Sequence, residues 1–323
     1  MNKFTDFAVL IIFATGCFAD TFGTGDNQFT IDFVDIVADT SYGGQSVGSG
    51  FTTSNIDYNY RIGTYEITNN QWDKFKAEYG TVTGNPLNAY DENPSFTSSN
   101  VPTNEVSWYE AAQFVNWLNI SNGYQVAYKF IGTQGTSDYA LATWSGLEAW
   151  KGENLYRHRD AHYFLPTEDE WVKAAYWNGS NIQTYATLDD TIPEAGVDSN
   201  YNQEFPYDGP WDIGSGTIEL NGTFDMMGNV WEWLESPYDD QNFGISSLRG
   251  VLGGGCGSYD YRLASSYRDT DSPYSQDDTR GFRITSVSKP FKCPSADLSG
   301  DCFVDILDLA ILAQQWCSGL RNN

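Results

Sequence analysis

The chain has 323 residues, of which 40% are hydrophobic and 16% aromatic, so it can bury the core of one large domain and carry an additional segment. Its 17 basic and 43 acidic residues give a formal net charge of −26. That balance excludes nucleic acid and anionic membrane surfaces as partners, since both need a basic surface, and favours cations. Beyond the N-terminus, no stretch reaches the ~18 apolar residues that a membrane span requires.

Residues 1–19 have the pattern of a secretory signal peptide, with Lys3, an apolar run over 7–13 and small residues before a cleavage site after Ala19. The apolar run is too short for a membrane span. An alternative is a lipobox at 14–17, which would make Cys17 a lipid-anchored N-terminus. Either reading predicts an exported protein, secreted to the extracellular space or held at the cell surface.

Three amphipathic helices are expected, because the same capping-box pattern occurs three times. Thr68, Ser107 and Thr167 are each followed three residues later by Gln or Glu, which allows side chain and backbone to cap each other. The first helix should end at Gly80 and the second before Gly123. A strand is expected at the start of the domain, from residue 29. Neither βαβ alternation nor a fixed-period repeat is present.

The stretch 222–236, GTFDMMGNVWEWLES, has neither a helical nor a strand period, so we expect an irregular loop. The carboxylates of Asp225 and Glu232, with backbone carbonyls near Gly228 and Val230, are the hard oxygen ligands that Ca²⁺ takes. The alternative interpretation is a loop held by its tryptophans, with both acids in solvent.

The run DMMGNVWEW within this stretch resembles the signature of the formylglycine-generating enzyme, or sulfatase-modifying factor, family. Further family-like pieces lie in the family's order along the chain, at 65–75, 102–118 and 164–177 before this run and at 262–284 after it. The resemblance covers 29–285 and implies an α+β, irregular, loop-rich C-type-lectin-like fold. The domain is expected to span residues 20–288.

The resemblance also implies metal sites. Asp225, Gly228, Val230 and Glu232 fall on the family's Ca²⁺ ligand positions. A second Ca²⁺ site is implied at Asn200 and the carbonyl of Tyr201, with Asp208 or Asp212 as a further candidate ligand.

The enzymes of this family hold copper(I) with two cysteines that follow a glycine-rich segment. Here residues 259–264, the equivalent region, contain no cysteine, and Cys256 is the single cysteine near the glycines. Since one thiolate cannot form a two-thiolate copper(I) site, we expect no catalytic residues and no copper, with Cys256 as a buried, small apolar side chain. The family's cleft would survive as a groove suited to a glycan or peptide. Its expected lining is Trp231, Tyr259, Tyr261 and Arg268.

The tail, residues 289–323, carries oxygen side chains at the spacing of an EF-hand-type calcium loop. The candidate ligands are Asp297, Ser299, Asp301, Asp305 and Asp308. This resembles one half of a dockerin, which implies a cohesin-like partner, although Cys302 stands where glycine is usual and only one repeat is found. The alternative is an acidic loop before an amphipathic helix.

One disulfide is expected among the three cysteines of the tail, and its pairing stays open. These cysteines are Cys293, Cys302 and Cys317. Together the observations predict an exported, calcium-stabilised, non-catalytic module that binds an extracellular glycan or protein ligand. The alternative function is a formylglycine-generating oxidase that acts on sulfatase cysteines.

Overall fold

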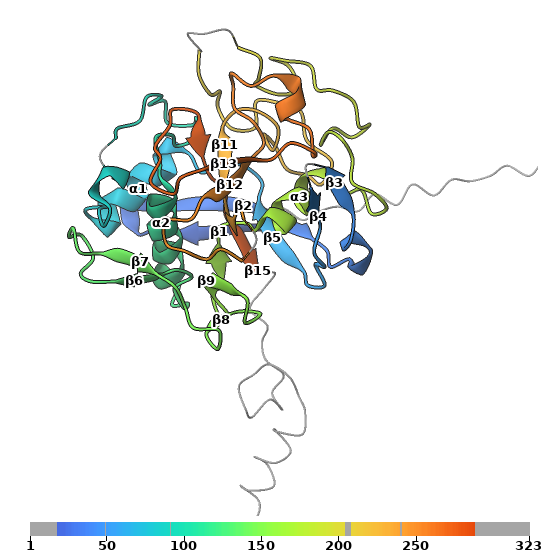
Figure 1. The fold of residues 1–323 in the computed structure, drawn as a ribbon. Helices are drawn as coiled ribbons and strands as arrows, with labels where there is room; N and C mark the ends of the chain where they lie inside the picture. The colour runs from blue at the N-terminus through green and yellow to red at the C-terminus, as the bar shows by residue number, and fades with distance from the viewer. Residues whose placement is uncertain (1–17, 49, 91, 204–207, 240, 288–323) are drawn as a thin grey trace, which may run out of the picture. The chain divides into compact units, whose positions relative to one another are not determined.

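The computed structural model describes residues 18–48, 50–90, 92–203, 208–239 and 241–287 (Figure 1). The predicted lipid anchor at Cys17 and the predicted calcium loop at 297–308 lie outside these residues. Within them, no helix is long and apolar enough to cross a membrane.

A five-stranded sheet brings together the start and the end of the domain. Its order is β1 (Phe18–Phe22), β2 (Phe29–Ile36), β5 (Tyr60–Gly63), β15 (Thr285–Val287) and β10 (Tyr163–Phe164). The strand expected from residue 29 is confirmed, and its buried Phe29, Ile31 and Phe33 alternate as in a sheet with one face on the core.

β1 extends across the expected signal cleavage site, since Ala19 pairs with Asp32 of β2. The next residue, Asp20, has a carboxylate that accepts hydrogen bonds from Arg61 at 3.0 Å and from Tyr163 at 2.8 Å. Cleavage after Ala19 would therefore leave the acid that ties β1 to its sheet at the new N-terminus. The cleavage itself stays a prediction.

A second sheet has the order β13 (Asp269–Asp271), β12 (Arg249–Leu252), β11 (Trp231–Pro237) and β14 (Arg280–Gly281). The prediction of a loop over the whole of 222–236 is wrong for its second half, which forms the inner strand β11. Nearly every residue of β11 is buried, so the sequence lacks the alternation that a half-exposed strand shows.

The three helices are α1 (Asn69–Tyr79), α2 (Trp108–Ser121) and α3 (Glu168–Tyr176), which confirms the prediction. Each begins with the predicted capping box, in which the N-cap hydroxyl and the N3 side chain exchange hydrogen bonds with the backbone. α1 packs beside α2, and α3 packs beside β11 (Figure 1).

Short hairpins and 3-10 turns are the remaining regular elements among the described residues. They are η1 (Gly25–Asn27), η2 (Thr40–Tyr42), β3 (Ser46–Gly48), β4 (Phe51–Thr52), η3 (Leu87–Ala89), β6 (Lys129–Ile131), β7 (Ala140–Ala142), β8 (Ala149–Trp150), β9 (Asn154–His158) and η4 (Asp260–Arg262). The long loop between α3 and β11 carries the first half of the predicted calcium site.

Candidate functional site

The turn before β11 holds the chain in left-handed conformations that aim its polar groups inward. Asp225, Gly228 and Asn229 have φ of 59°, 82° and 60°. Asp and Asn tolerate this region better than other side chains, and Gly does so without strain. The buried carboxylate of Asp225 accepts hydrogen bonds from the Trp211 indole at 2.9 Å and from the Gly214 amide at 2.7 Å.

Glu232, on β11, is fully buried and already has donors on both oxygens. The Nε of Arg283 lies 2.8 and 2.7 Å from its two oxygens, and Nη2 lies 2.6 Å from one of them. The Trp171 indole adds a bond of 2.7 Å. Since Arg283 occupies both oxygens, this carboxylate is satisfied in the structure without a metal.

Two further buried acids, which were not among the predicted ligands, face the same guanidinium. Glu66 and Glu219 both act electrostatically on Arg283, and both are fully buried. Burial raises the pKa of Glu219 to about 8. Glu66 accepts one hydrogen bond, from the side-chain amide of Asn229 at 3.1 Å, while its second oxygen has no hydrogen-bond partner among the described residues.

With Asp225 and Glu232, these acids make four buried carboxylates around a single arginine. Burial, and then the neighbouring charge of Asp225, raises the pKa of Glu66 well above its ordinary value. Such a cluster is stable only if protons or a bound cation reduce its mutual repulsion. Glu66 lies within the family-like piece 65–75, and only its tertiary position shows its role.

The predicted second metal site adjoins the first. The backbone carbonyl of Asn200 accepts from the backbone amide of Asn229 at 2.8 Å. The side-chain amide of Asn200 donates to the side-chain oxygen of Asn229 and to the Gly209 carbonyl, each at 3.1 Å. The hydroxyl of Tyr201 donates to the Pro193 carbonyl at 2.7 Å.

Asp208 and Asp212 are exposed. Among the described residues, no group of three or more His, Cys, Asp and Glu side chains is placed to hold a metal ion. Calcium at both loops stays a prediction.

Cys256 lies next to this region and is buried, as expected. Its backbone amide donates to the Asn229 carbonyl at 2.9 Å. Burial raises the pKa of the Cys256 thiol to about 11, so the group is a neutral thiol near pH 7. Because the thiolate is the form that attacks substrates and binds soft metals, this environment does not activate Cys256.

Three of the four residues expected to line a groove belong to one aromatic cluster. Tyr259 and Tyr261 are 62% and 51% exposed, and their rings stack with centroids 6.2 Å apart. Tyr261 meets Tyr267 edge-on at 5.7 Å, and Tyr267 lies 6.0 Å from the buried Trp231. We call Tyr259, Tyr261 and Tyr267 the tyrosine surface. Tyr267 was not among the residues predicted to line the groove.

The fourth residue, Arg268, is engaged elsewhere. Its Nη2 lies 2.7 Å from Glu168 at the start of α3, and its Nε lies 2.5 Å from the other oxygen of Glu168. The guanidinium also lies over the rings of Tyr238 and Phe51, at 4.7 and 5.1 Å. Arg268 therefore contacts Glu168 and Phe51, which line a separate pocket, and is not itself among the residues that line it.

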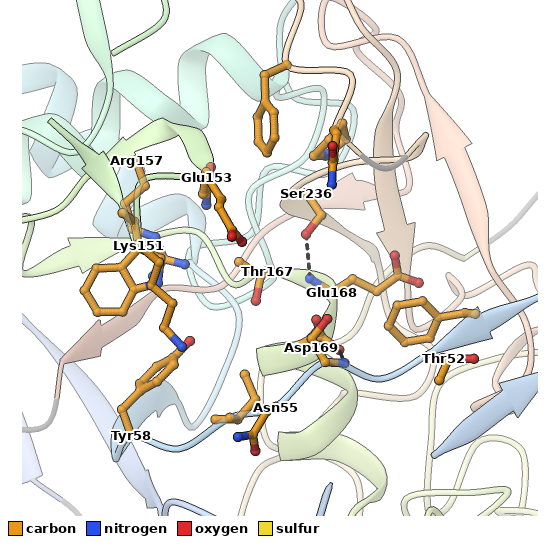
Figure 2. Close-up of a pocket in the computed structure, with 18 residues that line it drawn as sticks. Thr52, Asn55, Tyr58, Lys151, Glu153, Arg157, Thr167, Glu168, Asp169 and Ser236 are labelled. Atoms are coloured by element: carbon orange, nitrogen blue, oxygen red, sulfur yellow. Dashed lines mark hydrogen bonds between the residues drawn. The ribbon is translucent and has the colours of Figure 1, made fainter. Parts of the chain in front are cut away.

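That pocket, shown in Figure 2, has a volume of about 340 Å³. It lies between the segment 51–58, the β8–β9 turn and the N-terminus of α3. No local sequence pattern indicates this pocket, because its walls come from distant parts of the chain.

The fold and the site define a mixed α+β, loop-rich domain of the sulfatase-modifying type. The family model described as "Sulfatase-modifying factor enzyme 1-like domain" matches residues 39–287. The chain therefore belongs to this family.

Two curated relatives are similar in sequence. The chain is 26% identical over 232 residues to "Chaperone protein LppX" of Paenibacillus barcinonensis, which covers 60% of the chain and 72% of the relative. It is 30% identical over 149 residues to "Inactive C-alpha-formylglycine-generating enzyme 2" of Mus musculus, which covers 43% of the chain and 44% of that relative. The chain thus aligns with less than half of the mouse protein.

Among solved structures, "Treponema denticola variable protein 1" is similar, with a TM-score of 0.59 and 20% identity. The match covers 83% of this chain and 99% of that one. At this identity the likeness establishes the fold alone, and it confirms the predicted fold class.

Proposed function

We propose that this chain is a non-catalytic binding module, exported from the cell and stabilised by calcium. The observation that carries the proposal is the state of Cys256. It is the single cysteine within the family match at 39–287, and it is a buried thiol whose pKa is raised to about 11. A copper(I) centre needs soft thiolate ligands, and one buried neutral thiol does not supply them.

The relatives are consistent with this function. One carries the word inactive in its name, and another is named a chaperone, which is a protein that acts by binding. In this chain the tyrosine surface is the feature suited to binding an extracellular glycan or protein ligand, because exposed tyrosines offer both a ring face and a hydroxyl. A cohesin-like partner of the tail is a further proposal.

The alternative is a formylglycine-generating oxidase, and one experiment separates the two. The purified protein is incubated with a Cys-x-Pro-x-Arg peptide, with and without copper, and the peptide is analysed by mass spectrometry for conversion of cysteine to formylglycine. We expect no conversion in either condition. A Cys256→Ser variant, matched to the wild type by its melting temperature, is the control.

Conversion by the wild type that disappears in Cys256→Ser would overturn the proposal and establish the oxidase. Conversion that persists in Cys256→Ser would also overturn it, and would place the reactive thiol outside residues 39–287.

A further inference from the structure

The pocket of Figure 2 is built on a rigid floor. Arg157, on β9, is fully buried, and its Nη1 lies 3.2 Å from Glu170. Its Nε lies 2.9 Å from Glu235, in an ion pair too bent to be a hydrogen bond. The guanidinium stacks over Phe164 at 3.8 Å and Trp150 at 5.1 Å. Because the carboxylates of Glu170 and Glu235 neutralise this guanidinium, the floor is preorganised and has no strong positive charge to offer an anion.

Aromatic rings form one wall of the pocket. Tyr58 and Trp150 meet edge-on, with ring centroids 5.5 Å apart. The hydroxyl of Tyr58 donates to Glu170 at 2.7 Å, which fixes its ring. Lys151, at the tip of the β8–β9 turn, places its ammonium 4.7 Å from the Tyr58 ring centre and 3.2 Å from Asp57.

Polar side chains line the pocket together with these rings. Figure 2 shows Glu153, Asp169 and Asn55 among the lining side chains. One oxygen of Asp169 accepts from the Ser54 amide at 2.8 Å, which holds this carboxylate at the first turn of α3. Glu153 is exposed on the β8–β9 turn. The pocket therefore combines carboxylate acceptors, an amide and an ammonium donor beside aromatic rings.

We infer that this pocket binds a saccharide of one or two rings. Sugar hydroxyls donate to carboxylates such as Glu153 and Asp169 in charge-assisted bonds, and accept from Lys151 and Asn55. The C–H face of a sugar packs on an aromatic ring, which Trp150 and Tyr58 offer here. The volume lies within the ~300–1,000 Å³ of small-molecule sites.

Other ligand classes fit the pocket less well. An anion would face the carboxylates of Glu153 and Asp169, which repel it. An apolar ligand would cover the same carboxylates without giving them hydrogen bonds, which is unfavourable. The inference rests on the proposed binding function, since it names a ligand class, but it concerns a site separate from the tyrosine surface.

The test is a titration of the full chain with D-glucose, D-galactose, D-mannose, N-acetyl-D-glucosamine, cellobiose and xylobiose, followed by tryptophan fluorescence and saturation-transfer NMR. We expect millimolar or tighter binding of at least one sugar. Trp150→Ala and Glu153→Ala should each weaken it by about tenfold or more. Leu147→Ala, at an exposed side chain outside the pocket, should leave it unchanged, while Tyr261→Ala reports separately on the tyrosine surface.

Absence of binding by every sugar at millimolar concentration would overturn the inference. Binding that is lost in Tyr261→Ala but kept in the pocket variants would also overturn it, while supporting the tyrosine surface as the binding site of the proposed function. Glu153 and Asn55 are exposed, so Glu153→Ala and Asn55→Ala keep the test decisive if Trp150→Ala does not fold.

Discussion

At the scale of single residues, Gly228 shows how the turn before β11 limits what the sequence can contain. It has φ of 82°, and a Cβ there would lie 2.6 Å from the Ser199 hydroxyl and closer still to the Asn200 carbonyl. The backbone of residue 200 is itself bonded to the Asn229 amide, so it cannot move away without breaking that bond. This glycine is required by space as well as by conformation.

We therefore predict that Gly228→Ala destabilises the protein much more than Gly44→Ala. Gly44 has φ of 79°, yet nothing lies within 4 Å of its added Cβ, so this matched variant carries only the conformational cost of roughly 1–2 kcal/mol. Chemical denaturation measures both. Equal losses of stability in the two variants would show that the neighbours of Gly228 relax freely.

Asp225, Glu232 and Cys256 were all singled out by the sequence, and all three are buried. Their neighbours were not predictable from local pattern. Arg283 lies 51 residues from Glu232 along the chain, and Glu66 lies 163 residues from Asn229. A motif shows which residue types a loop contains, whereas the charges that meet it are decided by tertiary packing.

At the scale of elements, the helices were predictable because each begins with a capping box, which is a local sequence pattern. Strand β11 was not, since a strand buried on both faces has no alternation and its Trp-rich segment carries no period. The short strands β8, β10 and β14 each have two residues, too few for any periodic signal. Of these short elements, β8 contributes Trp150 to the pocket of Figure 2, and β14 pairs with β11 at Glu232 of the carboxylate cluster.

The capping box of α2 gives a prediction with a pH dependence. Glu110 accepts from the Ser107 amide at 2.9 Å, and burial raises its pKa from 4.5 to about 8. A carboxyl whose pKa is higher in the folded state favours folding below pH 4.5, and this contribution is lost as the pH rises through about 8. Glutamine keeps the acceptor oxygen and does not ionise.

Accordingly, the free energy of unfolding of Glu110→Gln should match that of the wild type near pH 4.5 and increasingly exceed it as the pH rises to about 8. The difference should be a few kcal/mol at most, because each pKa unit corresponds to about 1.4 kcal/mol. Urea denaturation at a series of pH values measures the difference. A difference that does not vary with pH would contradict the assignment of a buried, protonated Glu110.

At the scale of the whole molecule, an excess of acid over base reaches the interior as well as the surface. Glu66, Glu219, Asp225 and Glu232 share Arg283, and the chain carries 43 acidic against 17 basic residues. A divalent cation that binds only the native state would stabilise the fold by about 2.7 kcal/mol at a hundred times its Kd.

We predict that calcium raises the melting temperature of the wild type relative to the same protein with chelator. Asp225→Asn should abolish that rise, whereas Asp73→Asn, at an exposed acid on α1, should preserve it. Scanning calorimetry or circular dichroism gives the comparison. Identical melting temperatures of the wild type in calcium and in chelator would refute the calcium site at residues 225–232.

The placement of β15 between β5 and β10 has a consequence for how this protein is made. The Gly63 amide bonds the Ile284 carbonyl at 2.7 Å, so the first sheet is closed by residues that a ribosome adds some 220 positions after β5. Such long-range closure is slow and leaves strand edges open until synthesis reaches β15. A nascent chain stalled before that point would present two unpaired edges, which makes it a substrate for holding factors until synthesis is complete.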